Sequence, residues 1–339
     1  MPDRRMPRPS IPALAACLAL ALAACSPAPT STGAEGAASA DTAGATALPR
    51  GWQHVVGVDV PDAGPVVQQL PATVRSDDGV EVTVTDSRRT IAGGDDVISV
   101  MEALDLDAHV FAAPKQFLFN RTTGAEGVLS LDATLFVGNS LRRHGNSGLA
   151  AKLRDAGLPA VIVDDLQPAP EKVRKTAALF GADEAGERLA VQVQAQLDEA
   201  ARIASGHARR PKVIHVSATG AGGQPTVGGA DTAAAALIRL AGGDNIGDAA
   251  GVRDYSVLSQ EGIVAAAPDV ILVSEHDLEL FGGADALWSQ YPTLRQTPAG
   301  AAGRVWVMPD VQLKYTSVAS GAGAIALARA LSALADQAP

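Results

Sequence analysis

Hydrophobic and polar residues alternate in two short runs near residue 80. Residues 72–75 and 80–84 both alternate in the manner of a β-strand, and Asp78 and Gly79 lie between them. Asp-Gly between two alternating runs is a strong hairpin signal, because glycine adopts the positive φ that a tight turn needs. The pattern predicts a β-hairpin over residues 72–84.

Beyond this hairpin, short apolar runs alternate with longer segments of helical period. Such runs are typical of buried strands, and the amphipathic segments between them cover the faces of a mostly parallel sheet. We expect strands at residues 89–92, 109–112, 133–137, 159–163, 213–216, 270–273 and 304–308. We expect helices at residues 95–104, 126–131, 148–156, 168–180, 231–240, 259–266, 284–290 and 320–335.

A long helical segment interrupts this rhythm midway. Leu189, Val193 and Leu197 fall on one helical face, and residues 187–204 contain neither glycine nor proline. An uninterrupted amphipathic pattern of this length predicts one continuous helix. The sequence therefore predicts an α/β protein with two Rossmann-like lobes joined by one long helix, preceded by a short N-terminal hairpin.

The two halves of the chain share a weak internal repeat. Residues 126–137 and 261–272 both begin with Glu-Gly, continue as a short helix and a turn, and end in an apolar strand. Ligands of α/β lobes bind beyond the carboxyl ends of the strands. We therefore look for a ligand site in the loops just before these two segments.

The N-terminus has the pattern of a lipoprotein signal peptide. Arg4, Arg5 and Arg8 precede an apolar stretch over 11–24, which ends in Leu-Ala-Ala before Cys25. The stretch is too short for a stable spanning helix, and small residues before a cysteine suit a lipoprotein signal peptidase. An ordinary secretory peptide with a chance cysteine is the alternative. We predict lipidation at Cys25, and localisation on the outer face of the cell membrane.

The residues after Cys25 are those of a flexible tether. They are mainly Ala, Ser, Thr, Gly and Pro, a composition that buries too little apolar surface to fold.

The domain boundaries that we predict follow from these patterns. They are 1–24 for the signal peptide, 25–48 for the lipidated tether, 49–88 for the N-terminal extension and hairpin, 89–183 for the N-terminal lobe, 184–206 for the interlobe helix and 207–339 for the C-terminal lobe.

Composition narrows the function. The chain has two cysteines, Cys17 and Cys25, and the first leaves with the signal peptide, so we expect no disulfide in the mature protein. The net charge of −10, without a block of Lys and Arg, argues against a nucleic-acid partner.

Several motifs together resemble the lipoproteins that bind iron complexes, haem or cobalamin for bacterial ABC importers. They are the run ending at Asp86, Gly-Ala-Glu-Gly-Val-Leu-Ser-Leu at 124–131, the long helix, Tyr-Ser-Val-Leu-Ser-Gln-Glu-Gly at 255–262, and Ala-Ala-Ala-Pro-Asp-Val-Ile-Leu at 265–272. The resemblance covers residues 72–336 and is strongest to actinobacterial haem (hemin) binders. It implies the class III periplasmic-binding-protein fold, haem as transported ligand, a permease dimer as partner and a monomer in solution.

The chain departs from these haem binders at two places. They carry a histidine shortly before the N-lobe Ala-Glu motif, where this chain has Arg121. They also carry Tyr-x-Arg on the first strand of the C-terminal lobe, where this chain has His215 and Ser217. The resemblance therefore makes His215 the candidate axial ligand of haem iron, a role that imidazole fills well. A hydrogen-bonded core histidine is the alternative.

Four further residues are candidates for the ligand site. Tyr255, whose phenolate could ligate ferric iron, precedes the second repeat segment in an expected loop, where it could equally be a packing aromatic. Arg121 and Arg253 precede the two repeat segments and suit the propionates of haem, although exposed arginines are usually only solvated. His144, in a polar loop, is a possible second donor to iron.

The resemblance also assigns a docking role to Glu126 and Glu261, one on each lobe, which would meet arginines of the permease. Both begin a helix, where a carboxylate also complements the helix dipole.

Three alternatives to a haem carrier stay open: a ferric-siderophore or cobalamin binder, a surface interaction protein that has lost its ligand, and a lipid-anchored hydrolase. The sequence has no set of nucleophile and base that would favour an enzyme.

Overall fold

The computed structural model of the chain describes residues 48–112, 124–138, 148–218 and 226–337. Residues 47–339 form one compact unit. Within the described residues, no helix combines the length and apolar character needed to cross a membrane.

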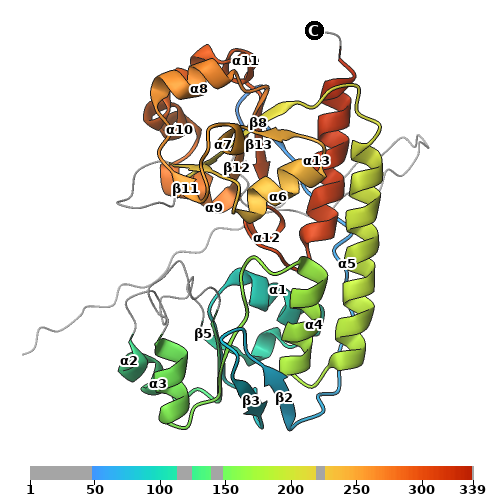
Figure 1. The fold of residues 1–339 in the computed structure, drawn as a ribbon, viewed down its shortest axis with the longest axis vertical. Coiled ribbons are helices and arrows are strands. Elements are labelled where there is room, and N and C mark those ends of the chain that lie inside the picture. The colour runs from blue at the N-terminus through green and yellow to red at the C-terminus, as the bar shows by residue number, and fades with distance from the viewer. Residues whose placement is uncertain (1–47, 113–123, 139–147, 219–225, 338–339) are drawn as a thin grey trace, which may run out of the picture. The chain divides into compact units, whose positions relative to one another are not determined.

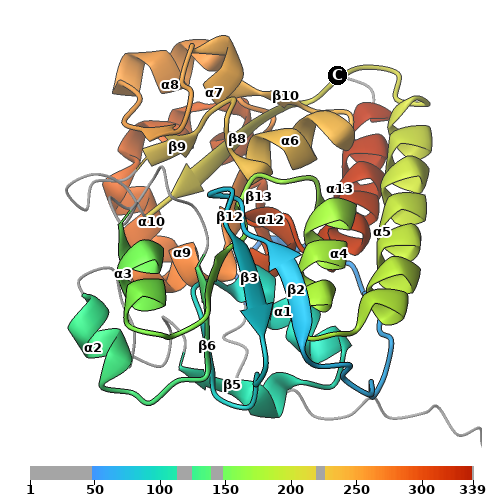
Figure 2. The ribbon, with the colours of Figure 1, turned by 60° about the horizontal axis from the view of Figure 1, so that its bottom comes forward.

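The N-terminal lobe is a parallel sheet covered by helices. Its four strands lie in the order β5-β4-β6-β7, and a separate antiparallel pair, β2 and β3, confirms the predicted hairpin (Figure 2). The strands are β2 (Ala72–Arg75), β3 (Glu81–Val84), β4 (Thr90–Ala92), β5 (Val110–Ala112), β6 (Leu135–Gly138) and β7 (Ala160–Ile162). The helices are α1 (Asp95–Ala103), α2 (Ala125–Leu129), α3 (Leu149–Asp155) and α4 (Ala169–Leu179).

The C-terminal lobe contains a seven-stranded mixed sheet. Its order is β1-β13-β12-β8-β9-β11, with β10 also beside β8, and only β9 and β11 run antiparallel to their neighbours. The strands are β1 (Gln53–His54), β8 (Lys212–Ser217), β9 (Thr226–Gly228), β10 (Asp244–Asn245), β11 (Tyr255–Ser256), β12 (Val270–Ser274) and β13 (Val305–Met308). The helices are α6 (Ala233–Leu240), α7 (Ile246–Ala249), α8 (Gln260–Ala266), α9 (Glu275–Phe281), α10 (Ala284–Gln290), α11 (Pro298–Ala301), α12 (Asp310–Leu313) and α13 (Ser320–Ala335).

A single long helix, α5 (Asp183–Ala204), belongs to the cores of both lobes. Leu189 and Val193 are buried in the N-terminal core, and Ala200 is buried in the C-terminal core. Helix α13 packs beside α5 (Figure 1). The prediction of two α/β lobes joined by one continuous helix is confirmed.

The segment before the hairpin also connects the lobes, which the sequence did not indicate. It starts as the edge strand β1, paired with β13 of the C-terminal lobe. Gln312 then holds Gly57 by two buried hydrogen bonds, donating to its carbonyl at 2.7 Å and accepting from its N–H at 2.8 Å. Further along, the Gln69 N–H donates to the Gly181 carbonyl of the N-terminal lobe at 2.9 Å. Residues 53–69 are therefore integrated into both lobes.

Candidate ligand-binding site

Strand β8 delivers the central residue of the candidate site. The residues of β8 are apolar and buried, except for the exposed first residue, Lys212, and two buried polar residues, His215 and Ser217. His215 pairs in register with Leu272 of β12 and is 1% exposed. Because β8 runs parallel to β12, its last residues lie at the carboxyl ends of the strands, where α/β lobes bind ligands.

The imidazole of His215 is buried without hydrogen bonds. Neither Nδ1 nor Nε2 has a partner among the described residues. Burial lowers the pKa of His215 to about 4, and the positive charge of Lys314 also lowers it, while Asp277 opposes this. The ring is therefore neutral at pH 7. A buried polar group without a partner usually costs stability, which points to a functional reason for keeping it.

Glycine at position 228 leaves room for this ring. A Cβ atom at Gly228 would meet His215 Nδ1 at 2.7 Å and the ring of Tyr255 at 3.5 Å. Strand β9, which contains Gly228, pairs with β8 through Val227 and Val216. The close approach of backbone and imidazole therefore depends on the missing side chain.

Tyr255 stands against the imidazole. The two ring centroids are 5.8 Å apart and the planes meet at 71°, an edge-to-face contact. Tyr255 lies in the short strand β11, antiparallel to β9 and directly opposite Gly228, so its expected position in a loop was wrong. The side chain is half-buried, whereas that of His215 is fully buried. A ligand from solvent therefore reaches the phenol before the imidazole.

A buried ion pair lies beside the two rings. Lys314 Nζ is 2.9 Å from Asp277 Oδ2, with the side chains 10% and 0% exposed. Asp277 also accepts hydrogen bonds from the hydroxyls of Ser217 and Ser274, each at 3.0 Å. Burial alone would raise the pKa of Asp277, but Lys314 and the hydrogen bonds hold it below its usual value. Lys314 Nζ is also 6.0 Å from the ring centroid of Tyr255.

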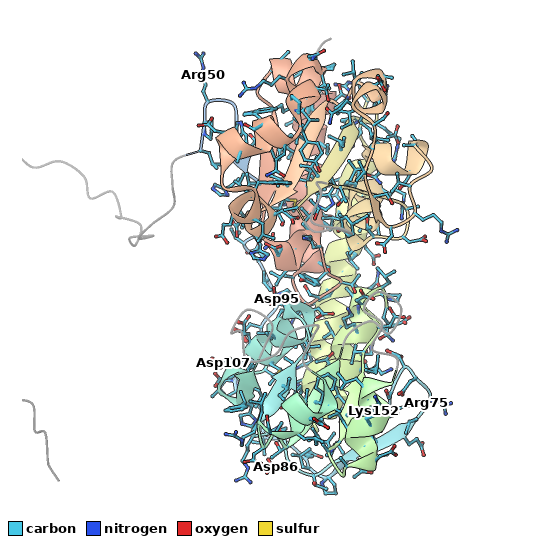
Figure 3. The ribbon with its side chains drawn as sticks, turned by 90° about the vertical axis from the view of Figure 1, so that its left-hand side faces the viewer. Arg50, Arg75, Asp86, Asp95, Asp107 and Lys152 are labelled. Atoms are coloured by element: carbon cyan, nitrogen blue, oxygen red, sulfur yellow. The ribbon has the colours of Figure 1, made fainter. Side chains whose placement is uncertain are left out.

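Tyr315 follows Lys314 and is a further aromatic of this region. Burial raises its pKa, and so do the negative charges of Asp95, Asp96 and Asp310, and then Tyr255. Asp95 and Asp96 begin α1 of the N-terminal lobe, and Figure 3 labels Asp95 there. Sequence reasoning missed both Lys314 and Tyr315. For Tyr315, the signal in the sequence was the rarity of tyrosine, of which the whole chain has three.

The other predicted residues are not all brought to this cluster. Arg253 forms an exposed ion pair with Asp231 at 2.7 Å, and its own side chain is 83% exposed. Glu126 and Glu261 are exposed in the first turns of α2 and α8, as expected for docking residues. Their roles stay predictions, as does the ligand role of Arg253. The remaining candidates, Arg121, His144 and Cys25, lie outside the described residues.

The arrangement suits a metal complex better than a bare metal ion. The described residues contain no group of three or more His, Cys, Asp or Glu side chains able to hold a metal. The site offers instead one phenol and one imidazole in contact. Oxygen and nitrogen donors of this kind can fill the one or two axial positions that a porphyrin leaves on its iron.

Comparison with known proteins places the chain in a family. A model of the periplasmic binding proteins matches residues 134–311, more than half of the chain, and the chain belongs to this family. Its two lobes joined by one long helix have the class III fold of such proteins. The resemblance seen in the sequence is thereby confirmed. No curated protein matches the chain.

Solved structures similar to the chain include haem-binding proteins. The periplasmic haem-binding protein RhuT from Roseiflexus sp. RS-1, in apo form, is 31% identical over 74% of this chain and 100% of RhuT, with a TM-score of 0.65. The periplasmic haem-binding protein BhuT, in complex with two haems, is 26% identical over 74% of this chain and 100% of BhuT, with a TM-score of 0.61. A mutant of the haem-binding protein HmuT is 25% identical over 83% of this chain and 93% of HmuT, with a TM-score of 0.69.

Proposed function

We propose that this periplasmic binding protein captures haem outside the cytoplasm and delivers it to an ABC importer for iron uptake. The observation that carries the proposal is the contact between Tyr255 and His215 at the carboxyl end of β8. It provides an oxygen and a nitrogen donor at the place where α/β lobes bind ligands. The similarity to RhuT, BhuT and HmuT supports haem as the ligand.

The two donors differ in access, which gives them different parts in binding. The half-buried phenol of Tyr255 meets the ligand first and ligates ferric iron as phenolate. His215 lies behind it, and iron reaches the imidazole only if the ring of Tyr255 moves aside. His215 is a good donor at neutral pH because burial keeps it unprotonated.

Apolar side chains near the strand ends suit the faces of a porphyrin. Val257, just after β11, is 58% exposed, and Leu166, in the loop after β7, is 41% exposed. The guanidinium of Arg253 would bind the haem propionates. The ion pair of Arg253 with Asp231 lies at the surface and permits this. Exposed ion pairs are worth only about 0–1 kcal/mol, so a propionate can replace the carboxylate at little cost.

Delivery requires a membrane location and a docking surface. In this proposal the lipid on Cys25 holds the protein at the outer face of the cell membrane. Glu126 and Glu261 then meet arginines of a permease dimer, one glutamate from each lobe. Their exposure at the starts of α2 and α8 supports this role.

A hemin titration followed by absorbance tests the proposal. We expect wild type to give a saturable bound-haem spectrum, Tyr255→Phe to alter the ferric spectrum and lower affinity at least tenfold, and Tyr291→Phe to match wild type. Tyr291 is the matched control, because its hydroxyl is buried and donates to the Thr226 carbonyl at 2.7 Å. Absence of a bound spectrum in wild type would overturn the haem assignment. Ferric hydroxamates and cyanocobalamin in the same assay would then test the siderophore and corrinoid alternatives.

A further inference from the structure

Basic side chains gather at the end of the C-terminal lobe that is opposite the ligand site. Strands β1, β8, β10, β12 and β13 are mutually parallel, so their amino ends lie along one edge of the sheet. The segments that enter these strands, with the first residue of each strand, contain five basic residues, which we call the basic face: Arg50, Arg209, Arg210, Lys212 and Arg304. Four of them are exposed and Arg304 is half-buried.

Asp269 holds three members of the basic face together. Its carboxylate lies 3.0 Å from Nη1 of Arg209 and accepts from the Lys212 N–H at 2.8 Å. Its backbone carbonyl accepts from Nη1 of Arg304 at 2.7 Å. These three basic residues therefore form one cluster, although they come from two separate segments of the chain.

The other two members lie next to this cluster. Arg210 forms an ion pair with Asp244 at 2.6 Å, and Asp244 lies opposite Lys212 in the pairing of β10 with β8. The carbonyl of Arg50 would lie 3.1 Å from a Cβ atom on Gly303, the residue before Arg304. The basic face is therefore continuous from the first described residues to β10.

The basic face has a surplus of positive charge. Its five basic residues are opposed by two carboxylates in the same segments, Asp244 and Asp269. Helix α13 ends beside them, with His207 Nε2 3.2 Å from the Ala328 carbonyl, and α5 and α6 lead directly into the same segments. The last turns and C-caps of these three helices do not reduce the surplus, since they carry Arg202, Arg239 and Asp336.

The corresponding segments of the N-terminal lobe have the opposite balance. Those that enter β4, β5, β6 and β7 contain two basic residues and four carboxylates: Arg88, Arg89, Asp86, Asp105, Asp107 and Asp132. Figure 3 labels Arg50 at the outer end of the C-terminal lobe and Asp86 at the outer end of the N-terminal lobe. Helix C-termini favour nearby cations in both lobes alike. The architecture alone therefore does not account for the basic face.

The chain enters the folded unit at the basic face. Leu48 is the first described residue and lies two positions before Arg50, and residues 26–47 separate it from Cys25. Even fully extended, a segment of this length keeps Leu48 within about 80 Å of Cys25. A lipid on Cys25 would therefore attach this end of the protein to the membrane.

We propose that the basic face contacts the anionic phospholipid headgroups of the membrane and thereby directs the ligand site towards solvent. This inference rests on the proposed function, which places the protein at the membrane through Cys25. Near an anionic lipid surface, each Lys or Arg strengthens binding about fivefold. The fold provides the opposite charge at the end of the protein that the anchor attaches, in a chain whose net charge is −10.

The ligand site is too far from the basic face to share this contact. Strand β8 has six residues, from Lys212 of the basic face to Ser217 beside the ligand site. It spans about 20 Å, whereas electrostatic attraction is screened over about 8 Å at physiological salt. With the basic face on the lipid, the carboxyl ends of the strands lie away from the membrane and stay open to haem.

Cosedimentation with vesicles tests the contact. Cys25→Ala protein, purified from the soluble extracytoplasmic fraction, has no lipid, so its binding reports the protein surface alone. We expect it to bind vesicles of mixed phosphatidylglycerol and phosphatidylcholine at least about tenfold more tightly than vesicles of phosphatidylcholine alone. Binding should disappear between about 0.1 M and about 1 M salt, as the screening length falls from about 10 Å to about 3 Å.

Charge-reversal variants in the same background locate the contact. Arg50→Glu with Lys212→Glu should weaken binding to phosphatidylglycerol vesicles at least about tenfold, and Arg50→Lys with Lys212→Arg should keep it. The matched control is Arg88→Glu with Lys152→Glu, which changes the net charge equally in the N-terminal lobe and should leave binding near its starting value. Both control residues are exposed.

Asp244→Asn provides a test with the opposite sign. It removes an exposed carboxylate from the basic face and should strengthen binding about fivefold, so the proposal stays testable even if a charge reversal prevents folding.

Three results would overturn the proposal: equal binding to both kinds of vesicle, equal losses in the two double charge reversals, or binding to soluble polyphosphate without binding to phosphatidylglycerol vesicles. If wild type has no lipid on Cys25, the proposed anchor fails, while cosedimentation still decides whether the basic face binds anionic lipid.

Discussion

The phenol ring of Tyr255 meets the imidazole of His215 edge to face, with the ring centroids 5.8 Å apart. This contact covers an imidazole of which both nitrogens lack a hydrogen-bond partner among the described residues. The two residues are 40 positions apart in the chain, and the antiparallel pairing of β9 with both β8 and β11 brings them together. The contact has consequences for stability as well as for ligand binding.

Burial of His215 predicts a specific loss of stability in acid. Unfolded, the histidine takes up a proton near pH 6.5, but in the fold it does so only near 4. Between these values the unfolded chain binds more protons, so the free energy of unfolding falls as the pH falls from 6.5 to 4. The full difference amounts to about 3 kcal/mol. Urea unfolding of wild type at pH 7 and pH 4.5 should show most of this loss.

His215→Leu removes the titrating group and should lessen this pH dependence. His276→Leu is the matched control, because the side chain of His276 is 41% exposed, and it should keep the wild-type pH dependence. An identical loss between pH 7 and pH 4.5 in wild type and His215→Leu would show that the acid sensitivity comes from other groups.

Local pattern was enough to predict β8, the hairpin and α5. Each depends on a periodicity that the chain itself displays: alternation in the strands, and an unbroken 3.6-residue period in the helix. The candidate role of His215 came instead from the family resemblance. The pattern placed it near the end of an apolar strand, but its missing hydrogen bonds depend on neighbours from β9 and β11.

The ion pair and the N-terminal segment could not be predicted in this way. Asp277 and Lys314 lie in separate polar stretches, and only packing of the C-terminal lobe brings them together. Gly57 and Gln312 are 255 positions apart, and nothing in either local sequence indicates their hydrogen bonds. Contacts of this kind can be identified only from the tertiary structure, because the local sequence around a polar residue near a strand end is equally compatible with exposure to solvent.

A second ion pair, in the N-terminal lobe, should be important for stability. Lys172 Nζ donates to Asp96 Oδ2 at 2.6 Å, and both side chains are 0% exposed. Lys172→Met leaves a buried carboxylate without its counter-charge and should cost about 3–5 kcal/mol in urea unfolding. Arg174→Met removes one partner of an exposed pair with Glu187 and should cost about 1 kcal/mol or less. Similar losses of unfolding free energy in Lys172→Met and Arg174→Met would contradict the burial of the Lys172–Asp96 ion pair.

The segment that connects both lobes should tolerate no side chain at position 57. A Cβ atom on Gly57 would lie 2.2 Å from the backbone carbonyl of Ala322 in α13. Gly57→Ala should therefore destabilise the protein by about 1–3 kcal/mol through overpacking. Gly124→Ala is the control, since among the described residues no atom outside its own neighbours lies within 4 Å of a Cβ there. Thermal unfolding of both variants checks this, and a wild-type melting temperature for Gly57→Ala would mean that residues 53–69 are not held as described.

The predicted lipid anchor has a direct genetic test. Cys25→Ala removes the only thiol that signal cleavage would leave in the mature chain. The variant should move from the membrane fraction to the soluble extracytoplasmic fraction, and Cys17→Ala should stay in the membrane fraction. Retention of Cys25→Ala in the membrane fraction would exclude lipidation at this cysteine.

The most direct test of the central claim is the position of iron in crystals grown with hemin, located by anomalous scattering at the iron edge. We expect an iron peak at the carboxyl end of β8, within ligand distance of the Tyr255 hydroxyl oxygen or, if the ring of Tyr255 has moved aside, of the His215 imidazole. An iron peak remote from both residues, or no peak in crystals soaked at saturating hemin, would contradict it.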